Sequence, residues 1–260
     1  MSKYHVVMTC NEAGWDQYGR RCVSAFLRHW GAPLSVYTEN FSLGSLAGAN
    51  AIQAQDLMAI DWIRNFKDRY SDRELCVGKR EPHARWAAVS WAHAVAATID
   101  GCERHPGKIV IRLDADVFTH EDVTEQWLDG LFDQECALGL LMRSVESGCD
   151  YPEMGFGMFN TKHPALATII QRWKALYVSG GILKLDGWTD AHALLASLVG
   201  MEPSRLICSL SGTGVSHPHP FINGPLGQRM DHMKGPRRKL AGKSDVSDLS
   251  KPRGEAYWNV

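Results

Sequence analysis

A short apolar run that ends in two aspartates constrains the fold more than any other part of the chain. Residues 108–113 are Lys-Ile-Val-Ile-Arg-Leu, and Asp114-Ala115-Asp116 follow directly. A short run rich in β-branched residues predicts a strand that is buried on both faces, as in parallel sheets. Ligands of open α/β sheets bind outside the carboxyl ends of the strands. The pattern therefore predicts an α/β fold in which Asp114 and Asp116 lie at the ligand-binding edge.

The two carboxylates predict a site for a divalent cation. No lysine or arginine lies between Asp114 and Asp116 to neutralise them. Mg²⁺ or Mn²⁺ held by one or two carboxylates usually takes its remaining ligands from water and substrate phosphates. The alternative is a solvated exit from a strand into a turn, where aspartate is common. The buried type of strand before the pair, together with the segments described below, favours the metal site.

Length and composition describe an ordinary globular α/β protein. The chain has 260 residues, of which 45% are hydrophobic and 22% charged, and its net charge of −1 excludes general attraction to nucleic acid. No apolar run approaches the roughly 20 residues of a membrane span, and the N-terminus lacks the pattern of a signal peptide. Seven cysteines without Cys-x-x-Cys spacing indicate free thiols in a reducing cytoplasm. The sequence makes no prediction of the oligomeric state.

Strand and helix patterns alternate along most of the chain. Predicted strands cover residues 4–10, 34–38, 109–113, 136–142 and 155–160, and predicted helices cover 16–29, 61–70, 83–102, 121–133, 164–180 and 190–199. This alternation predicts one domain over residues 1–244, with a central mixed, mostly parallel sheet flanked by helices. After Ser209 periodicity is lost, so we expect a long ordered loop and then a C-terminal tail of residues 245–260.

A basic segment near the C-terminus is the second indication of a site. Residues 229–243 contain six lysines or arginines and one acidic residue, Asp231. On a nearly neutral protein, such a segment favours one anionic ligand over a general nucleic-acid surface. Within it, His232 can supply an imidazole as a third ligand to Mn²⁺, and Lys234 can hold a diphosphate. The alternative for the segment is a solvated basic tail.

Two further carboxylates are candidates for catalysis. Glu153 precedes Gly155-Phe156-Gly157, a stretch that lets the backbone pass close to a bound ligand, although an edge strand after a turn would look the same. Asp190 opens an apolar helix, where an aspartate is either an N-cap or first-turn acid or a general base. Asp186 is the second choice for such a base.

The order of these segments resembles the nucleotide-sugar-dependent glycosyltransferases of the GT-A fold. Leu-Asp-Ala-Asp is followed by Glu-Met-Gly-Phe, Trp-Thr-Asp and Asp-His-Met-Lys-Gly-Pro-Arg-Arg-Lys. The resemblance spans residues 83–244 and is to bacteriophage enzymes, among them those that place sugars on hydroxymethylated pyrimidines of phage DNA. One departure is the helix before Asp-x-Asp, which commonly carries a lysine near its middle, whereas residues 90–94 have none.

The resemblance implies a single Rossmann-like GT-A domain that transfers a sugar from a nucleotide-diphosphate donor, a UDP-sugar first of all, to an acceptor hydroxyl. It implies Mn²⁺ or Mg²⁺ on Asp114, Asp116 and His232, and Lys234 on the diphosphate. Glu153 would face the donor sugar, and Asp190 would be the base of an inverting reaction. The acceptor would be hydroxymethylpyrimidine DNA in the bacterial cytoplasm, while a saccharide, lipid or protein acceptor stays open.

Two other functions compete with this one. A nucleotidyltransferase also places paired carboxylates at the end of a strand, but it normally has a Gly-rich loop with a lysine or arginine after the first strand. Residues 11–16 are acidic instead. A noncatalytic DNA- or nucleotide-binding protein could keep the same scaffold, but it would not need Asp114, Asp116 and His232 together.

Overall fold

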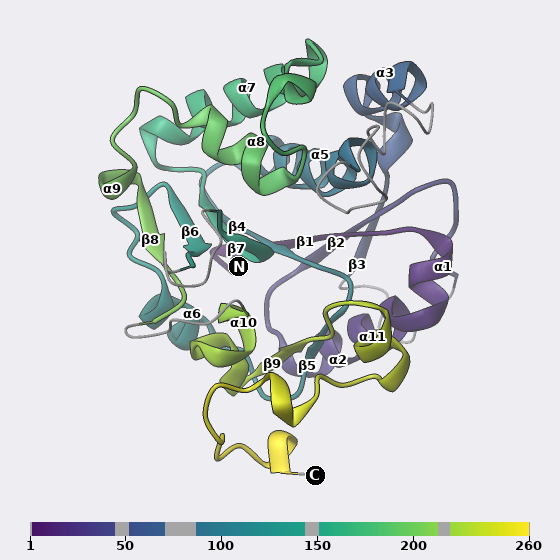
Figure 1. Cartoon of the computed structure of the whole chain (residues 1–260), viewed down its shortest axis with the longest axis vertical. Coiled ribbons are helices and arrows are strands. Elements are labelled where there is room, and N and C mark those ends of the chain that lie inside the picture. Colours follow the sequence, from purple (N-terminus) through teal and green to yellow (C-terminus); the bar gives the residue numbers. More distant parts are fainter. Residues whose placement is uncertain (1, 45–51, 71–86, 144–150, 213–218, 260) are drawn as a thin grey trace.

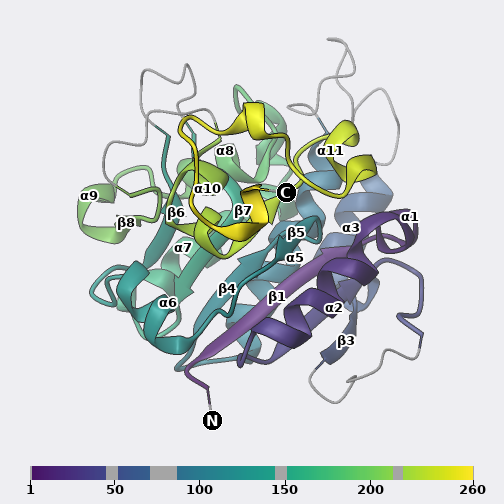
Figure 2. The same cartoon turned by 90° about the horizontal axis from the view of Figure 1, so that it is seen from below.

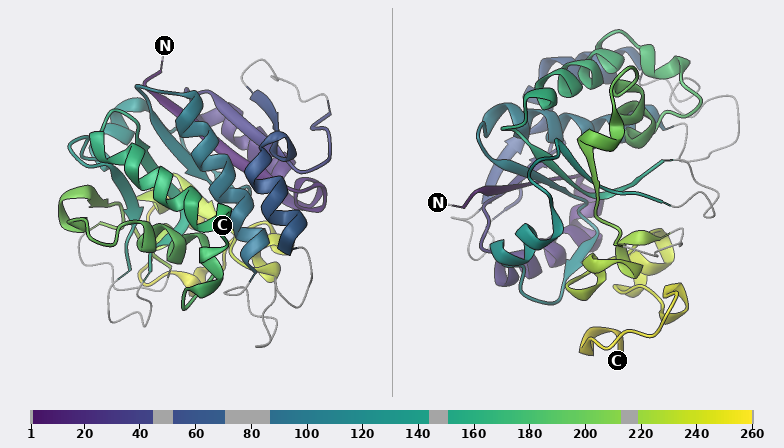
Figure 3. Two further views of the ribbon diagram at one scale, coloured as in Figure 1. Left: turned by 90° about the horizontal axis from the view of Figure 1, so that it is seen from above. Right: turned by 90° about the vertical axis from the view of Figure 1, so that its left-hand side faces the viewer.

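A computed structural model describes residues 2–44, 52–70, 87–143, 151–212 and 219–259. Its centre is a seven-stranded sheet with helices on both faces (Figures 1 and 3). The strands are β1 (Tyr4–Cys10), β2 (Leu34–Thr38), β3 (Ile52–Asp56), β4 (Ile109–Leu113), β6 (Leu138–Leu141), β7 (Glu153–Asn160) and β8 (Ile207–Ser209). Their order across the sheet is β3-β2-β1-β4-β7-β6-β8.

Only β7 runs against its neighbours in this sheet. It pairs antiparallel with β4 and β6, whereas β3, β2, β1 and β4 are parallel to one another and β6 is parallel to β8. The predicted α/β fold with a mixed, mostly parallel sheet is therefore confirmed. Because β7 is reversed, its first residue, Glu153, lies at the edge where β4 ends. The Asp114 amide donates to the Gly155 carbonyl at 3.0 Å at this edge.

Apolar side chains on alternate sides of the strands build one core on each face of the sheet. In β4, Ile109, Ile111 and Leu113 belong to one core, and Val110 belongs to the other. Every residue of β4 is buried, as the apolar run predicts. The buried strand therefore holds Asp114 and Asp116 in fixed positions at the carboxyl edge of the sheet.

Two groups of helices cover the faces of the sheet (Figure 1). One face carries α1 (Glu12–Gly14), a π-helical turn over Trp15–Gly19, α2 (Arg20–His29) and α6 (Glu125–Leu131), and the other carries α3 (Asp61–Tyr70), α5 (Ala88–Arg104), α7 (Pro164–Val178) and α8 (Asp190–Ser197). The short helix α9 (Pro203–Leu206) precedes β8. None of the described helices is both long and apolar enough to cross a membrane.

The predicted ends of several elements need correction. The first helix begins at Glu12 and not at Asp16, because Asn11 accepts a hydrogen bond from the Gly14 amide at 2.7 Å and caps it. The helix predicted over 121–133 is limited to α6, since Thr124 caps it. Strand β3 was not predicted, because its sequence is mostly polar. The start of the helix predicted over 83–102, and most of the predicted loop at 41–50, lie outside the described residues.

The region after Ser209 is more regular than the sequence predicts. It contains α10 (Pro220–Asn223), β9 (Met230–His232) and α11 (Pro236–Ala241), and β9 pairs antiparallel with β5 (Val117–Thr119). These elements lie on the same face of the sheet as α2 (Figures 1 and 2). Hydrophobic periodicity does not predict these elements, because each is short and is stabilised by contacts with residues distant in sequence.

The last residues also pack on the domain. The Trp258 indole donates to the Gly227 carbonyl at 2.8 Å, and the Tyr257 hydroxyl donates to Asp231 at 2.7 Å. The domain boundary at residue 244 stays a prediction.

Candidate active site

A cavity of about 530 Å³ opens at the carboxyl edge of the sheet. Each residue that the sequence proposes for the site lines this cavity: Asp114, Asp116, Glu153, Asp190, His232 and Lys234. The second choice for the base, Asp186, is exposed and lies outside the described lining. The fold thus gathers the proposed residues from four separate segments.

The two aspartates and His232 lie close together in the cavity wall. His232 Nε2 lies 3.3 Å from Asp116 Oδ1 and 3.9 Å from Asp114 Oδ2. The short β5–β9 pair creates this contact, because His232 stands opposite Val117, the residue after Asp116. The Met233 amide also donates to the Asp116 carbonyl at 3.2 Å.

The other nitrogen of His232 faces Glu153. His232 Nδ1 lies 2.8 Å from Glu153 Oε1, and His219 Nδ1 lies 3.1 Å from Glu153 Oε2. Only 3% of Glu153 is exposed, and Arg143 and Lys234 flank its carboxylate at 3.8 and 3.9 Å. Burial opposes the charge, but the histidines outweigh it and hold the pKa of Glu153 well below its usual value.

Lysine and imidazolium charges compensate the aspartates. Lys239 Nζ lies 2.9 Å from Asp116 Oδ2. Burial lowers the pKa of His232, but Asp116 and Glu153 outweigh it and raise that pKa to about 10. Burial likewise opposes ionisation of Asp116, but His232 and Lys239 outweigh it and lower the pKa of Asp116. Burial raises the pKa of Asp114 despite its contact with Arg112.

The donor set fits a hard divalent cation. One ligand atom from each of Asp114, Asp116 and His232 lies within 4.8 Å of the others. Two carboxylates and an imidazole suit Mn²⁺, and the carboxylates suit Mg²⁺. The proton of His232 and the ammonium of Lys239 supply the positive charge that such a cation would bring to the same carboxylates.

Asp190 is held by a buried arginine. Its carboxylate pairs with Arg112 Nη2, whose side chain is 3% exposed, and Arg112 also lies 3.3 Å from Asp114 Oδ1. Burial opposes the charge, but Asp190 and Asp114 outweigh it and raise the pKa of Arg112. The N-cap of α8 is Thr189, whose hydroxyl accepts from the His192 amide, so Asp190 is a first-turn acid and not the cap.

Most cations of the basic segment bind within the fold. Arg238 pairs with Asp248, Arg229 donates to the Asp122 carbonyl, and Lys239 contacts Asp116. Lys234 lines the cavity with 46% of its side chain exposed. The segment is therefore an ordered wall of the cavity and not a solvated tail.

Several lining or neighbouring residues were not predicted from the sequence. Arg112 resembles any other residue of a buried strand, and His219 stands between two prolines without a pattern that marks a site residue. The remaining additions are Tyr18, Trp91, Arg143 and Lys239. Only Lys239 has a sequence signal, since it belongs to the basic segment.

Comparison with solved structures finds weak likeness to two sugar transferases. The chain is similar to mouse xyloside xylosyltransferase 1 in its apo form, with a TM-score of 0.46 and 13% identity over 79% of this chain and 84% of that one. It is similar to the apo WbbM bifunctional glycosyltransferase, with a TM-score of 0.46 and 11% identity over 78% of this chain but only 38% of that one. No family model and no curated protein matches the sequence.

Proposed function

We propose that this protein is a metal-dependent glycosyltransferase of the GT-A type, which moves a sugar from a nucleotide-diphosphate donor to an acceptor hydroxyl. One observation carries the proposal. Asp114 and Asp116 follow β4, His232 comes from β9, and all three line one cavity with two lysines. The volume of about 530 Å³ is in the usual range of small-molecule sites.

The donor would bind through its diphosphate. Asp114, Asp116 and His232 would hold Mn²⁺ or Mg²⁺, which when bound supplies charge neutralisation for the departing diphosphate. Lys234 and Lys239 line the same cavity and would contact phosphate oxygens directly, which would strengthen binding of the diphosphate. We take a UDP-sugar as the first donor to test.

Asp190 is our candidate for the proton acceptor. In an inverting transfer, the acceptor oxygen forms a bond to the anomeric carbon while the bond from that carbon to the diphosphate oxygen breaks. The acceptor proton passes to a carboxylate. Asp190 lines the cavity, where one oxygen pairs with Arg112 and the other accepts from the Ala191 amide at 2.8 Å. The oxygens of Glu153 both face histidines, one of them the proposed metal ligand His232. We therefore assign Glu153 to the support of His232 and take Asp190 as the base.

The resemblance of segment order supports hydroxymethylpyrimidine in phage DNA as the acceptor, in which case the enzyme acts in the cytoplasm of the bacterial host. The charge of the basic segment adds little support for a DNA acceptor, because several of its basic side chains bind within the fold. Lys234 and Arg237 are the exposed cations of the segment, and of these two Lys234 lines the cavity.

The test is release of nucleotide diphosphate from a panel of nucleotide sugars with Mn²⁺, with and without hydroxymethylpyrimidine DNA. We expect release that depends on both metal and acceptor and that is lost in Asp116→Asn. The matched control is Asp68→Asn, the same change at an exposed carboxylate of α3 outside the cavity lining. Release of nucleotide diphosphate only with a saccharide, lipid or protein would identify that molecule as the acceptor in place of DNA. Pyrophosphate release from a nucleoside triphosphate would instead identify a nucleotidyltransferase.

A further inference from the structure

The start of β7 holds the ring of His232. Glu153 and Gly155 both lie against the Nδ1–Cε1 edge of this ring. We propose that they form a cradle, defined as Glu153 and Gly155, which fixes the orientation of the His232 imidazole and directs Nε2 toward Asp116. Glu153 is then a positioning residue. This inference rests on the proposed function, because it assigns His232 Nε2 to the metal.

Glu153 selects which ring nitrogen faces the aspartates. Its Oε1 lies 2.8 Å from His232 Nδ1, so a proton on Nδ1 is held by the carboxylate. Nε2 then points to Asp116 at 3.3 Å and Asp114 at 3.9 Å. A carboxylate behind a ligating histidine fixes its tautomer and raises its basicity in many metal sites.

His219 extends this support to the backbone. Its Nδ1 lies 3.1 Å from Glu153, and its Nε2 lies 3.3 Å from the carbonyl oxygen of His232. The Ser244 hydroxyl donates to the same carbonyl at 3.2 Å. Both the ring and the main chain of His232 are therefore held in one network.

Gly155 gives the ring its space. A Cβ at this position would lie 2.6 Å from His232 Cε1 and 2.7 Å from Nδ1, closer than real side chains pack. The φ angle of Gly155 lies outside the left-handed region, so close approach of the imidazole is the reason for glycine here. In the structure, Gly155 therefore makes room for the His232 ring, whereas the sequence led us to expect that it makes room for a bound ligand.

A second metal ion on Glu153, His219 and His232 is the competing explanation, since their ligand atoms also lie within 4.8 Å of one another. Hydrogen bonding is favoured on two grounds. The 2.8 Å contact between Glu153 and His232 has the length of a charge-assisted hydrogen bond. Arg143 and Lys234 lie 3.8 and 3.9 Å from the same carboxylate, so another cation would meet two positive charges.

The experiment measures Mn²⁺ affinity of the full chain by electron paramagnetic resonance, without nucleotide, in a double-mutant cycle. Glu153→Ala and Gly155→Ala should each weaken Mn²⁺ binding about 10- to 100-fold, as second-shell changes do. Glu153→Gln keeps an oxygen acceptor for Nδ1 and should recover part of that loss. In a His232→Ala background, neither Glu153→Ala nor Gly155→Ala should weaken binding further. The wild type should bind one Mn²⁺ per chain.

Glu39→Gln is the matched control, because Glu39 also contacts a lysine and a histidine, Lys67 and His93, but lies outside the described cavity lining. Melting temperatures of all variants identify any that fail to fold, and Glu153→Gln and Gly155→Ala give two independent routes to the answer. Equal Mn²⁺ affinity in folded Glu153→Ala and wild type would overturn the proposed cradle. It would also be overturned if Glu153→Ala and Gly155→Ala weakened Mn²⁺ binding as much in the His232→Ala background as in the wild type. Two Mn²⁺ per chain would favour the second metal instead.

The outcomes separate this inference from the proposed function. Absence of any Mn²⁺ binding by the wild type would remove the metal from the proposed function, and the cradle's role with it. If the Glu153 and Gly155 variants lose Mn²⁺ affinity only when His232 is present, but no nucleotide sugar supports transfer, the cradle is retained and the proposed glycosyltransferase activity is rejected.

Discussion

Arg112, inside β4, forms a buried ion pair with Asp190, the first residue of α8, and the side chain of each is 3% exposed. The pair connects the central strand to the helix that borders the cavity. Arg112 also contacts Asp114, so one guanidinium compensates two carboxylates of the candidate site. Removing either partner would leave a buried charge less well paired, which is costly in proteins.

Asp190→Asn should therefore reduce both stability and transfer. We expect a loss of about 3 kcal/mol in the free energy of unfolding, typical of a broken buried ion pair and larger than the ~1 kcal/mol of a helix cap. Transfer should fall about 100-fold if Asp190 accepts the proton, with donor binding retained. Urea unfolding and transfer rates below the melting temperature measure the two effects. Thr124→Ala, which removes the cap of α6, controls for stability loss alone. Normal transfer in a destabilised Asp190→Asn protein would leave the residue a structural role only.

Lys239→Met should weaken binding of a nucleotide diphosphate with Mn²⁺ by about tenfold, since it removes one charge-assisted contact to phosphate. Calorimetry at two salt concentrations measures the change, and the difference from wild type should shrink at high salt. Lys184→Met removes an exposed lysine from outside the cavity lining and should bind normally. Unchanged affinity in Lys239→Met would limit this lysine to its contact with Asp116.

Helix α11 should become protected when ligand binds. Asp231 and His232 are buried in the β5–β9 pair, whereas α11 has no buried residue. We therefore expect a lid limited to residues 234–241. Trypsin should cut after Arg237 or Lys239, and UDP with Mn²⁺ should slow this cleavage severalfold. Equal rates of trypsin cleavage with and without ligand would indicate that α11 is a fixed part of the cavity wall and not a lid.

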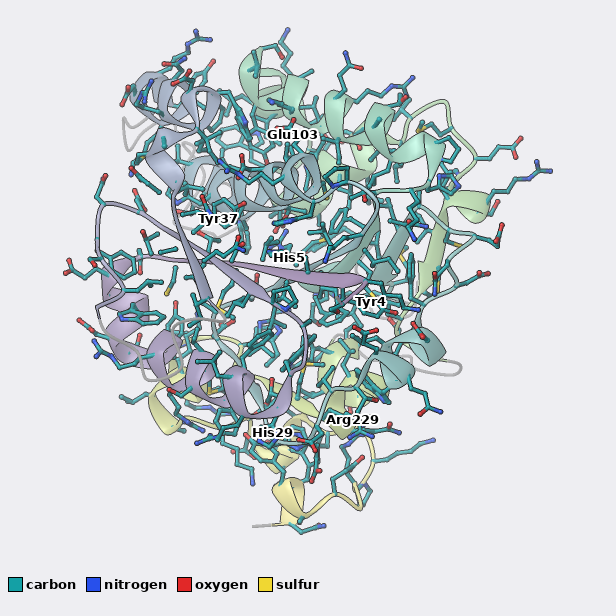
Figure 4. The ribbon with its side chains drawn as sticks, turned by 180° about the vertical axis from the view of Figure 1, so that it is seen from behind. Tyr4, His5, His29, Tyr37, Glu103 and Arg229 are labelled. Carbon is teal, nitrogen blue, oxygen red and sulfur yellow. The ribbon has the colours of Figure 1, made fainter. Side chains whose placement is uncertain are left out.

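Acid should destabilise the protein through His5. This side chain projects from β1 inside the molecule (Figure 4), is 2% exposed and lies 2.8 Å from the Ser35 hydroxyl. Burial, then His105 and Lys108, lower its pKa from 6.5 to about 4. The unfolded chain binds this proton more readily, so stability should fall as the pH drops from 6.5 toward 4, by up to about 3 kcal/mol.

The measurement for His5 is urea unfolding at several pH values. His5→Asn should flatten the acid limb of the stability curve, because asparagine does not titrate. Ser35→Ala, which keeps the titrating ring, should retain the slope. Parallel slopes in His5→Asn and wild type would assign the acid sensitivity to other histidines, such as the half-buried His93 and His120, whose pKa values desolvation also lowers to about 4.

The sequence alone determined the elements whose residues bury against the sheet. Strands β1, β2 and β4 were predicted because their apolar runs are short and nearly continuous, and α3 and α7 because their apolar faces repeat with helical period. The same local chemistry marked Asp114 and Asp116, because two carboxylates directly after a strand buried on both faces lie at the ligand-binding edge of an open α/β sheet. The basic segment marked His232 and Lys234 in the same way.

Tertiary structure alone decided how those residues meet. The reversal of β7 brings Glu153 to the edge where β4 ends, and a three-residue pairing places His232 beside Asp116. Arg112 and His219 gained their partners only through the fold, because a buried arginine on a strand and a histidine between prolines have no local pattern of their own. Short strands and buried ion pairs depend on contacts distant in sequence, and periodicity records only local ones.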